Sequence, residues 1–256
     1  MERLILIETS TALCSAALAE DGVITAYRES SAPKAHASLT AVFIQEMLEE
    51  KGLTIADCDA VCVSKGPGSY TGLRVGVSTA KGLCFGSGKP LIAIGTLDIL
   101  TAQAQEASSE TGIADHSVTV IADLIGNPSH IVPMIDARRM EVYAATFKRT
   151  DAPTNHSEAT PRYTQVTETA PAIIDETSYT ALLEQGPVHF IGDGAGKCAD
   201  VIKHPNATFI QCWPKASAML QPALRAYRER RFEDVAYFEP FYLKEFVATV
   251  SKKKLF

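Results

Sequence analysis

Two stretches of the sequence open in the same way, and this internal repeat constrains the fold more than any other feature. In the first, a run of apolar residues ends at Glu8, a small turn follows, and a strand returns from Cys14. In the second, a similar run begins at Val132, ends at Asp136 and returns from Glu141. A strand that turns back on itself at the head of each half is typical of two related units in tandem.

The segments around these strands alternate between strand-like and helix-like patterns. Short apolar runs bounded by turn residues predict buried strands, whereas apolar residues spaced three and four apart predict helices. Strands that alternate with helices favour an α/β architecture. We expect helices at 36–51, 72–85, 96–105, 179–185 and 216–230, and further strands at 60–64, 90–94 and 188–191.

The two openings also indicate how the chain divides. We expect an N-terminal half over residues 1–105, an insertion or linker over 106–131, and a smaller C-terminal half over 132–256. Residues 150–169 are rich in Thr, Pro, Ser and Asn, which is typical of a loop. The 256 residues, of which 46% are hydrophobic, are enough to bury a substantial core.

Composition and charge narrow the classes of protein to which the chain can belong. No run of about 18 apolar residues is present, so the sequence predicts no membrane-spanning helix. The apolar run before Glu8 is too short for a signal peptide, which favours a cytoplasmic protein. A formal charge of −6 argues against a generally basic nucleic-acid-binding surface, so we expect contact with RNA only through partners. The basic run 252–254 reads as a solvated tail, with an RNA contact as the alternative.

The cysteines form no recognisable metal-binding pattern. None belongs to a C-x-x-C pair, and the close pair of Cys58 and Cys62 lacks the second pair that a zinc site needs. Free cysteines in apolar surroundings usually pack as small hydrophobic residues, so we expect structural roles and no metal site. The six cysteines are Cys14, Cys58, Cys62, Cys84, Cys198 and Cys212.

A glycine-rich segment from Lys65 to Gly76 joins an expected strand to an expected helix. Its glycines let the backbone approach another group closely, and Ser69 or Thr71 can cap the helix. A helix N-terminus with free N–H groups suits an anion such as a phosphate. The alternative is a tight turn whose glycines serve close packing, and the sequence leaves both readings open. A Walker loop is excluded, because no lysine and hydroxyl follow the last glycine.

A second glycine-rich turn, 192–198, is a weaker candidate of the same kind. The segments 8–11 and 135–138 resemble the paired phosphate loops of the actin/hexokinase-type fold, in which an acidic residue helps to hold magnesium-bound phosphates. The alternative is that both acids simply end a strand. The candidate nucleotide- or anion-binding residues are Glu8, Thr9, Ser10, Gly68, Ser69, Asp136, Gly192 and Gly194.

The segment 66–76 reads G-P-G-S-Y-T-G-L-R-V-G and resembles the signature of the TsaB (YeaZ) family. Further matches follow the family's order: His36 at the start of a long helix, the segments 135–138 and 141–143, and the closing segment 239–243. They extend from the first strand to the closing segment. The signature residues are Gly66, Pro67, Gly68, Ser69, Tyr70, Thr71, Gly72 and Arg74.

This resemblance implies an actin/hexokinase-like (ASKHA) fold of two tandem ribonuclease-H-like halves, the second one reduced. It also implies a non-catalytic subunit that stabilises and activates TsaD, which forms N6-threonylcarbamoyladenosine next to the tRNA anticodon. TsaE is a further, ATP-hydrolysing partner, and tRNA is contacted indirectly through the complex. The chain itself is expected to require no cofactor, with ATP or ADP taking part within the complex.

Two departures bear on this expectation. TsaD carries an H-x-x-x-H metal motif on the helix where this chain has Thr96 and Leu100, and these side chains cannot replace two imidazoles. Glu8 stands where an aspartate is more usual in the first loop. Both departures favour a chain without catalytic residues or metal ligands of its own.

The resemblance further implies that the first two helices pack on the equivalent helices of TsaD. The same apolar surface can form a homodimer when the partner is absent. The alternative is that the apolar stripe belongs to the chain's own core. The candidate interface residues are His36, Leu39, Val42, Phe43, Met47, Leu73, Val77 and Leu83.

Two enzymatic functions remain as alternatives. The paired loops also suit an ATP-dependent kinase or ATPase of the same fold, although no residue is an evident catalytic base. A metalloprotease is suggested by the glycoprotease names of the wider family. The missing histidines, and the lack of an identifiable Ser-His-Asp arrangement, argue against hydrolysis.

Overall fold

Five strands from the first part of the chain form one sheet in the order β3-β2-β1-β4-β5. The computed structural model describes residues 1–107, 128–150 and 162–243. In it, β1 pairs with β2 antiparallel and with β4 parallel, so the hairpin expected at the head of the chain is present. The strands are β1 (Arg3–Glu8), β2 (Cys14–Glu20), β3 (Val23–Ser30), β4 (Ala60–Gly66) and β5 (Leu91–Gly95).

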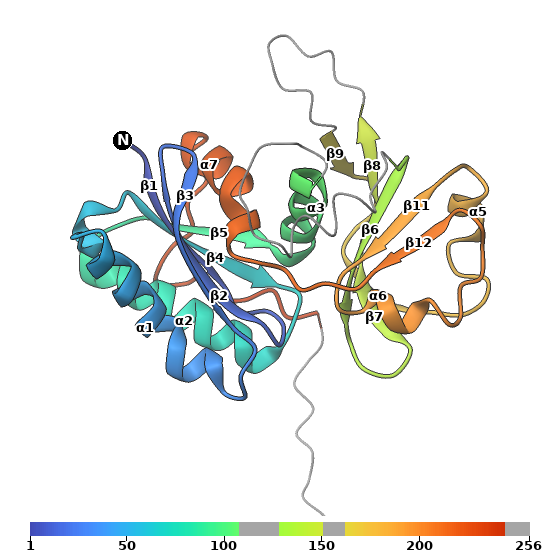
Figure 1. The fold of residues 1–256 in the computed structure, drawn as a ribbon, viewed down its shortest axis with the longest axis horizontal. Helices are drawn as coiled ribbons and strands as arrows, with labels where there is room; N and C mark the ends of the chain where they lie inside the picture. The colour runs from blue at the N-terminus through green and yellow to red at the C-terminus, as the bar shows by residue number, and fades with distance from the viewer. Residues whose placement is uncertain (108–127, 151–161, 244–256) are drawn as a thin grey trace, which may run out of the picture.

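Two helices, α1 (Ala35–Glu50) and α2 (Tyr70–Ser87), cover one face of this sheet (Figure 1). A short helix, η1 (Ile55–Asp57), leads into β4. Strands β1 and β4 are buried on both faces, which is why their sequences are apolar almost throughout. The helices predicted at 36–51 and 72–85 are confirmed, with α2 beginning two residues earlier than expected.

A second sheet repeats this strand order. Its path β10-β7-β6-β11-β12 matches β3-β2-β1-β4-β5 strand by strand, with β6 and β7 as the antiparallel hairpin. The helices in the places of α1 and α2 are only four residues long, so the second half is reduced and the internal repeat is confirmed. The elements are β6 (His130–Asp136), β7 (Glu141–Ala144), β8 (Phe147–Thr150), β9 (Arg162–Gln165), β10 (Ala170–Ile173), α5 (Thr180–Leu183), β11 (Val188–Ile191), α6 (Ala195–Cys198) and β12 (Ala207–Ile210).

The second half departs from the sequence prediction in two places. The pattern predicts one returning strand over 141–148, but the structure divides it into β7 and β8, which pair with different parts of β6. Part of the stretch expected as a loop forms β9, which pairs with β8. Its threonine and tyrosine residues are common in strands as well as in loops, so composition alone does not distinguish the two.

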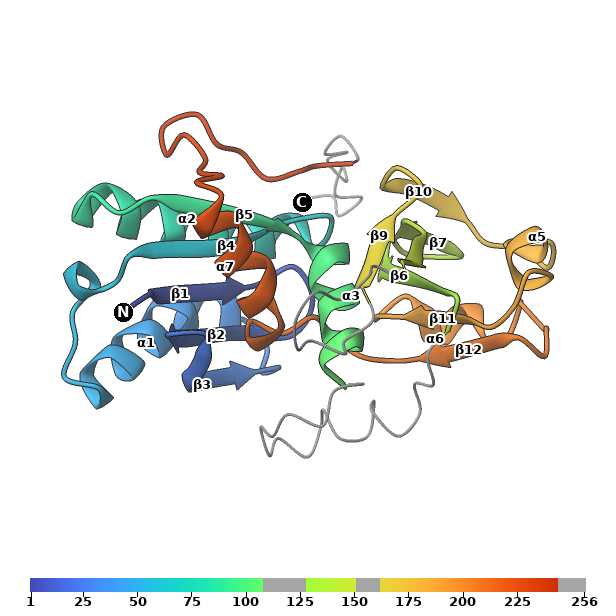
Figure 2. The ribbon, with the colours of Figure 1, turned by 90° about the horizontal axis from the view of Figure 1, so that it is seen from above.

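Two helices cross between the halves and join them (Figures 1 and 2). Helix α3 (Thr96–Ala107) follows β5, yet its side chains Leu97, Leu100 and Ala104 pack against the second sheet. Conversely, η2 (Ser217–Met219) and α7 (Leu220–Arg228) follow the second sheet but pack against the first. Each half of the sequence therefore covers a face of the other half's sheet.

The expected domain boundaries run through this exchange. Helix α3 ends just after residue 105, and α7 belongs to the range 132–256 although it packs on the N-terminal sheet. Most of the stretch 106–131, expected as an insertion or linker, lies outside the described residues. The two sheets, rather than two sequence ranges, are thus the natural units of the fold.

After α7 the chain runs back along the first half as a closing strap, residues 231–243. The backbone N–H of Glu233 donates to the Leu91 carbonyl (2.9 Å), and the N–H of Phe241 donates to the Lys65 carbonyl (2.7 Å). The strap therefore lies beside β5 and reaches the glycine-rich segment that precedes α2.

All six cysteines are buried and free, in agreement with the structural roles expected for them. Burial raises the pKa of the Cys58 and Cys84 thiols to about 11, so both stay protonated at neutral pH. In the ranges that the structure describes, no helix is long and apolar enough to cross a membrane.

We predict that Leu100→Ala lowers the free energy of unfolding by about 2–5 kcal/mol, because Leu100 is fully buried between α3 and the second sheet. Urea-induced unfolding followed by circular dichroism measures this loss. Ile173→Ala, at a side chain 78% exposed on β10, is the control and should change stability by less than about 0.5 kcal/mol. An equally small loss for Leu100→Ala would contradict the exchange of helices between the halves.

Candidate functional site

The first strand ends in a carboxyl group that is completely enclosed. Glu8 has no exposed surface, and the turn that follows it is also buried at Thr9, Ser10 and Thr11. The Glu8 oxygen Oε1 accepts hydrogen bonds from the Ser10 backbone N–H (2.6 Å) and from the Ser64 hydroxyl of β4 (3.0 Å). We call residues 9–13, which cover this carboxyl group, the first loop.

The enclosed position changes the acidity of Glu8. Burial raises its pKa to about 7, although the hydrogen bonds from Ser10 and Ser64 act in the opposite direction. Its second oxygen, Oε2, has no hydrogen-bond partner among the residues that the structure describes. A carboxylate in such surroundings is costly, so the site favours the neutral acid.

Three glycines let the first loop pack directly against α2 and the turn before it. A Cβ atom on Gly68 would lie 2.3 Å from the Ser10 carbonyl oxygen, and one on Gly72 would lie 2.1 Å from the Thr9 carbonyl oxygen. A Cβ atom on Gly76 would lie 2.2 Å from the Thr9 hydroxyl. Gly72 and Gly76, four apart in α2, share one side of the helix, and Gly68 lies in the turn before it; we call the three together the glycine face.

The first loop also closes the start of α2. Ser69 caps the helix, because its hydroxyl oxygen accepts a hydrogen bond from the Gly72 N–H (3.3 Å). The backbone N–H of Ser69 in turn donates to the Ser10 carbonyl (2.6 Å). Of the two readings that the sequence leaves open for this segment, the structure shows close packing.

The second half builds a similar arrangement. A Cβ atom on Gly192 would lie 2.2 Å from a carbonyl oxygen of β6, and one on Gly194 would lie 3.1 Å from the Asp136 nitrogen. The Asp136 N–H donates to the Asp193 carboxylate (2.9 Å), while the Asp136 carboxylate pairs with Lys197. Burial raises the pKa of Asp193 to about 6. The weaker glycine-rich candidate therefore also serves to pack a turn against a hairpin.

In the expected fold, the phosphates of a nucleotide are held between the segments 8–11 and 135–138. Backbone N–H groups that are free in these segments would have to bind those phosphates. The N–H groups of Ser10, Ser69 and Asp136 already donate within the chain. The carboxyl group of Glu8 is also buried beneath the first loop. In this arrangement these three backbone donors are not free to bind a phosphate.

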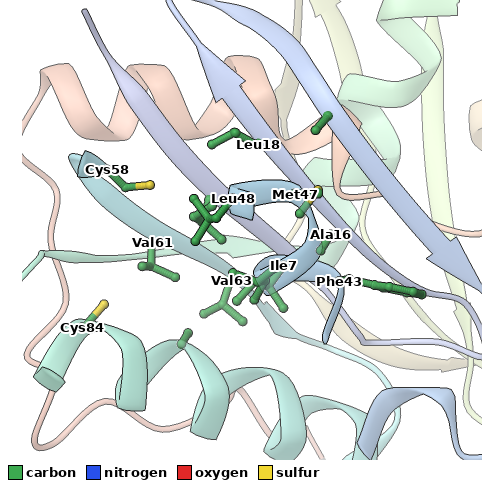
Figure 3. Packing of buried hydrophobic residues seen from close by; sticks show 14 of the residues in the cluster. Ile7, Ala16, Leu18, Phe43, Met47, Leu48, Cys58, Val61, Val63 and Cys84 are labelled. Carbon is green, nitrogen blue, oxygen red and sulfur yellow. The ribbon is translucent and has the colours of Figure 1, made fainter. Parts of the chain in front are cut away.

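The interface residues expected on α1 and α2 point in different directions. Phe43 and Met47 point into the core between α1 and the sheet (Figure 3), and Leu73 and Val77 of α2 are buried likewise. These four side chains fill the space between helices and sheet, so they cannot contact a partner in the folded chain. Of the others, Val42 is exposed, while His36, Leu39 and Leu83 are half-buried.

His36 instead connects α1 to the first loop. Its ring nitrogen Nε2 and the Thr11 carbonyl oxygen are hydrogen-bonded at 2.8 Å, and the ring N–H donates. The first loop is thus held by α1 on one side and by the glycine face of α2 on the other. A displacement of either helix would therefore act directly on the first loop.

Small side chains gather on part of the outward surfaces of α1 and α2, which the apolar pattern did not indicate, while the second half of α1 exposes Gln45, Glu46, Glu49 and Glu50. Phe85 of α2 protrudes with 87% of its surface exposed. Small residues at a helix surface let another helix approach closely, and an exposed aromatic ring is typical of a contact surface. Small residues four apart are the sequence signal that was missed. We define the outer face as Ala37, Ala41, Val42, Ser78, Gly82 and Phe85.

The signature segment also meets the closing strap, a contact that the sequence did not predict. The rings of Tyr70 and Tyr242 lie 4.9 Å apart, and the Arg74 guanidinium lies 5.5 Å from the Tyr70 ring centre. A Cβ atom on Gly66 would lie 2.9 Å from the Phe241 carbonyl oxygen. The two family-like segments, far apart in sequence, therefore pack on each other.

The positions at which the resemblance places metal-binding histidines belong to the core. Thr96 and Leu100 are both fully buried, and Leu100 packs against the second sheet. Within the described ranges, no group of three or more His, Cys, Asp or Glu side chains is placed to hold a metal ion.

Two repeated sheets joined by exchanged helices define a two-lobed protein of the ASKHA-like class. Two solved structures share this fold over 95% of the chain and 100% of their own. One is an uncharacterized protein from Pseudomonas aeruginosa with similarity to peptidase YeaZ (24% identity, TM-score 0.73), and the other is YeaZ from the same organism (22% identity, TM-score 0.73).

Sequence comparison identifies the family within this class. The family model TsaD, tRNA N6-adenosine threonylcarbamoyltransferase, matches residues 29–252. The tRNA threonylcarbamoyladenosine biosynthesis protein TsaB of Escherichia coli K12 is 29% identical over 252 residues, which are 96% of each chain. TsaB of Haemophilus influenzae is 36% identical over 146 residues, 57% of this chain and 54% of that protein. The chain therefore belongs to the TsaD family, and over nearly its whole length it is similar to a TsaB protein.

We predict that Gly72→Ala lowers the free energy of unfolding by about 1–3 kcal/mol, because the new Cβ atom would meet the Thr9 carbonyl. Gly82→Ala, in the same helix, is the control, since no atom lies within 4 Å of its added Cβ. It should raise stability by about 0.5–1 kcal/mol through helix propensity. Opposite signs in chemical denaturation support the glycine face, and a stabilising Gly72→Ala would rule it out.

We predict that ionisation of Glu8 weakens folding as the pH rises. Its folded-state pKa of about 7 lies above the ordinary value of 4.5, so the stabilisation is complete below about pH 4.5 and is lost as the pH rises through 7. Relative to Glu8→Gln, the wild type should lose about 3 kcal/mol between pH 4.5 and 8. Urea unfolding of both proteins at each pH measures this, and a difference independent of pH would refute it.

Proposed function

We propose that the chain takes part in threonylcarbamoyladenosine biosynthesis on tRNA, as a non-catalytic subunit that binds and activates the transferase TsaD. The similarity to the Escherichia coli TsaB protein carries this proposal, because it extends over 96% of both chains. Similarity of that extent includes both sheets, the signature segment and the closing strap, so the whole protein and not one motif resembles TsaB.

The arrangement of the two loops supports a non-catalytic role. Backbone N–H groups that a kinase of this fold would offer to phosphates donate to the chain's own oxygens at Ser10 and Asp136. Thr96 and Leu100 stand where the resemblance places the histidines of the catalytic subunit, and both are used in packing. These features argue against a kinase or a protease. ATP or ADP would then be bound within the complex and not required by this chain.

The outer face of α1 and α2 is the surface that we assign to TsaD. The TsaD family model matches most of this chain, so the two proteins share a fold and present related helices. Small side chains such as Ala41 and Ser78 would let those helices pack closely, with Phe85 at the edge. When TsaD is absent, the same face would pair two copies of the chain. In the complex, TsaE would be a further partner that hydrolyses ATP. The chain would contact tRNA only indirectly, through the complex.

We predict that Ala41→Arg and Ser78→Arg each abolish co-purification with TsaD from the same organism, since a long charged side chain would separate the helices. Ile173→Arg, on the exposed edge strand of the second sheet, is the matched control and should leave the complex intact. Size-exclusion chromatography with multi-angle light scattering measures the complex, and circular dichroism checks that each variant is folded.

Two results would count against the proposal. Retention of the complex by both arginine variants would remove the outer face as its binding surface. Failure of the wild-type chain to bind TsaD, together with ATP turnover by the chain alone, would refute the non-catalytic role and restore the kinase-like alternative.

A further inference from the structure

The first loop closes over an acid that has no counter-charge among the residues that the structure describes. Glu8 is fully buried, and its neighbours in the loop, Thr9 and Ser10, are at most 1% exposed. The groups that donate hydrogen bonds to its carboxyl group, the Ser10 N–H and the Ser64 hydroxyl, are neutral. A negative charge formed there would be stabilised only by these neutral donors, whereas a neutral acid is accommodated at little cost.

The titratable groups of the surrounding elements offer no compensation. The Cys14 thiol of β2 and the Cys62 thiol of β4 are the neighbours whose pKa the Glu8 charge raises further, after burial as the first cause. On α3, Asp98 is an acid whose own pKa is raised by burial. On α1, the His36 ring is bonded to the Thr11 carbonyl rather than to the carboxyl group.

The same loop holds both helices of the outer face. Its Thr9 and Ser10 carbonyls lie against Gly72 and Gly68, and the Ser10 carbonyl accepts the N–H of Ser69 at the start of α2. Its Thr11 carbonyl accepts the hydrogen bond from α1. Opening the loop would release contacts to both helices at once.

We propose that Glu8 is a proton-operated latch: the neutral acid keeps the first loop closed on α1 and α2, and loss of its proton to solvent opens the loop. Once ionised, the carboxylate needs water, and the covering loop must move to admit it. The helices then lose the support of the loop, and the outer face loses its fixed geometry. The step from loop opening to weaker TsaD binding rests on the proposed function, whereas the latch itself does not.

The first test uses the isolated full-length chain. Amide hydrogen exchange of the first loop is compared between the wild type and Glu8→Gln, a neutral mimic, from pH 4.5 to 8.5. The ratio of the two rates at each pH cancels the intrinsic pH dependence of exchange. It should be near one at about pH 4.5, rise between about pH 4.5 and 7 by at most tenfold per pH unit, the limit for one proton, and level off above about pH 7.

Two further variants make the test specific. Ser64→Ala removes a donor that stabilises the carboxylate, so the exchange ratio should level off at a higher pH. Glu184→Gln makes the same chemical change at an exposed position of the second half and should behave as the wild type. If Glu8→Gln does not fold, the shift caused by Ser64→Ala still tests the latch.

The second test measures TsaD binding over the same pH range. The dissociation constant of the wild type should rise between about pH 4.5 and 7 and then level off, while that of Glu8→Gln should stay constant. The two tests distinguish failure of the latch from failure of the proposed TsaD binding. A flat exchange ratio, or a Glu184→Gln variant that loses the pH dependence as Glu8→Gln does, overturns the latch even if TsaD binds. A rising ratio with no TsaD binding at any pH supports the latch and overturns the proposed function.

Discussion

The contact between the first loop and the glycine face of α2 is the interaction on which the rest of the structure depends. The loop carbonyls of Thr9 and Ser10 occupy the space that side chains on Gly68 and Gly72 would fill. This close approach places α2 on the sheet, seals Glu8 beneath the loop and leaves the helix N-terminus capped from inside. The signature segment is therefore explained by packing, and the properties of the outer face follow from it.

The second half of the chain repeats this arrangement of hairpin and glycine-rich turn. Both halves pair a hairpin with a glycine-rich turn, and the halves are joined because α3 and α7 each cover a face of the opposite sheet. In the first half the covering helices are long and present an outer face, whereas in the second they shrink to four residues. The asymmetry suits a protein that binds a partner through its first half.

Much of this fold could be predicted from the sequence, since hairpins, helical spacing and the order of elements are local signals. The sequence could not distinguish an anion site from close packing at Gly68 and Gly72, because the same freedom of the backbone serves both. Of the predicted apolar stripe, Phe43 and Met47 lie on the inward side of α1, in the core, whereas Val42 lies on the outer face. The exchange of α3 and α7 depends on contacts between segments that are distant in the sequence. Local sequence patterns do not predict such contacts.

The central claim, a TsaB-type subunit that acts through TsaD without chemistry of its own, is tested most directly by threonylcarbamoyl transfer. Purified TsaD and TsaE from the same organism would be supplied with ATP, tRNA and the activated threonylcarbamoyl donor, with this chain present or omitted. The account predicts that modified tRNA forms only when the chain is present, and that the chain alone neither modifies tRNA nor hydrolyses ATP. Equal transfer without the chain, or ATP turnover by the chain alone, would contradict it.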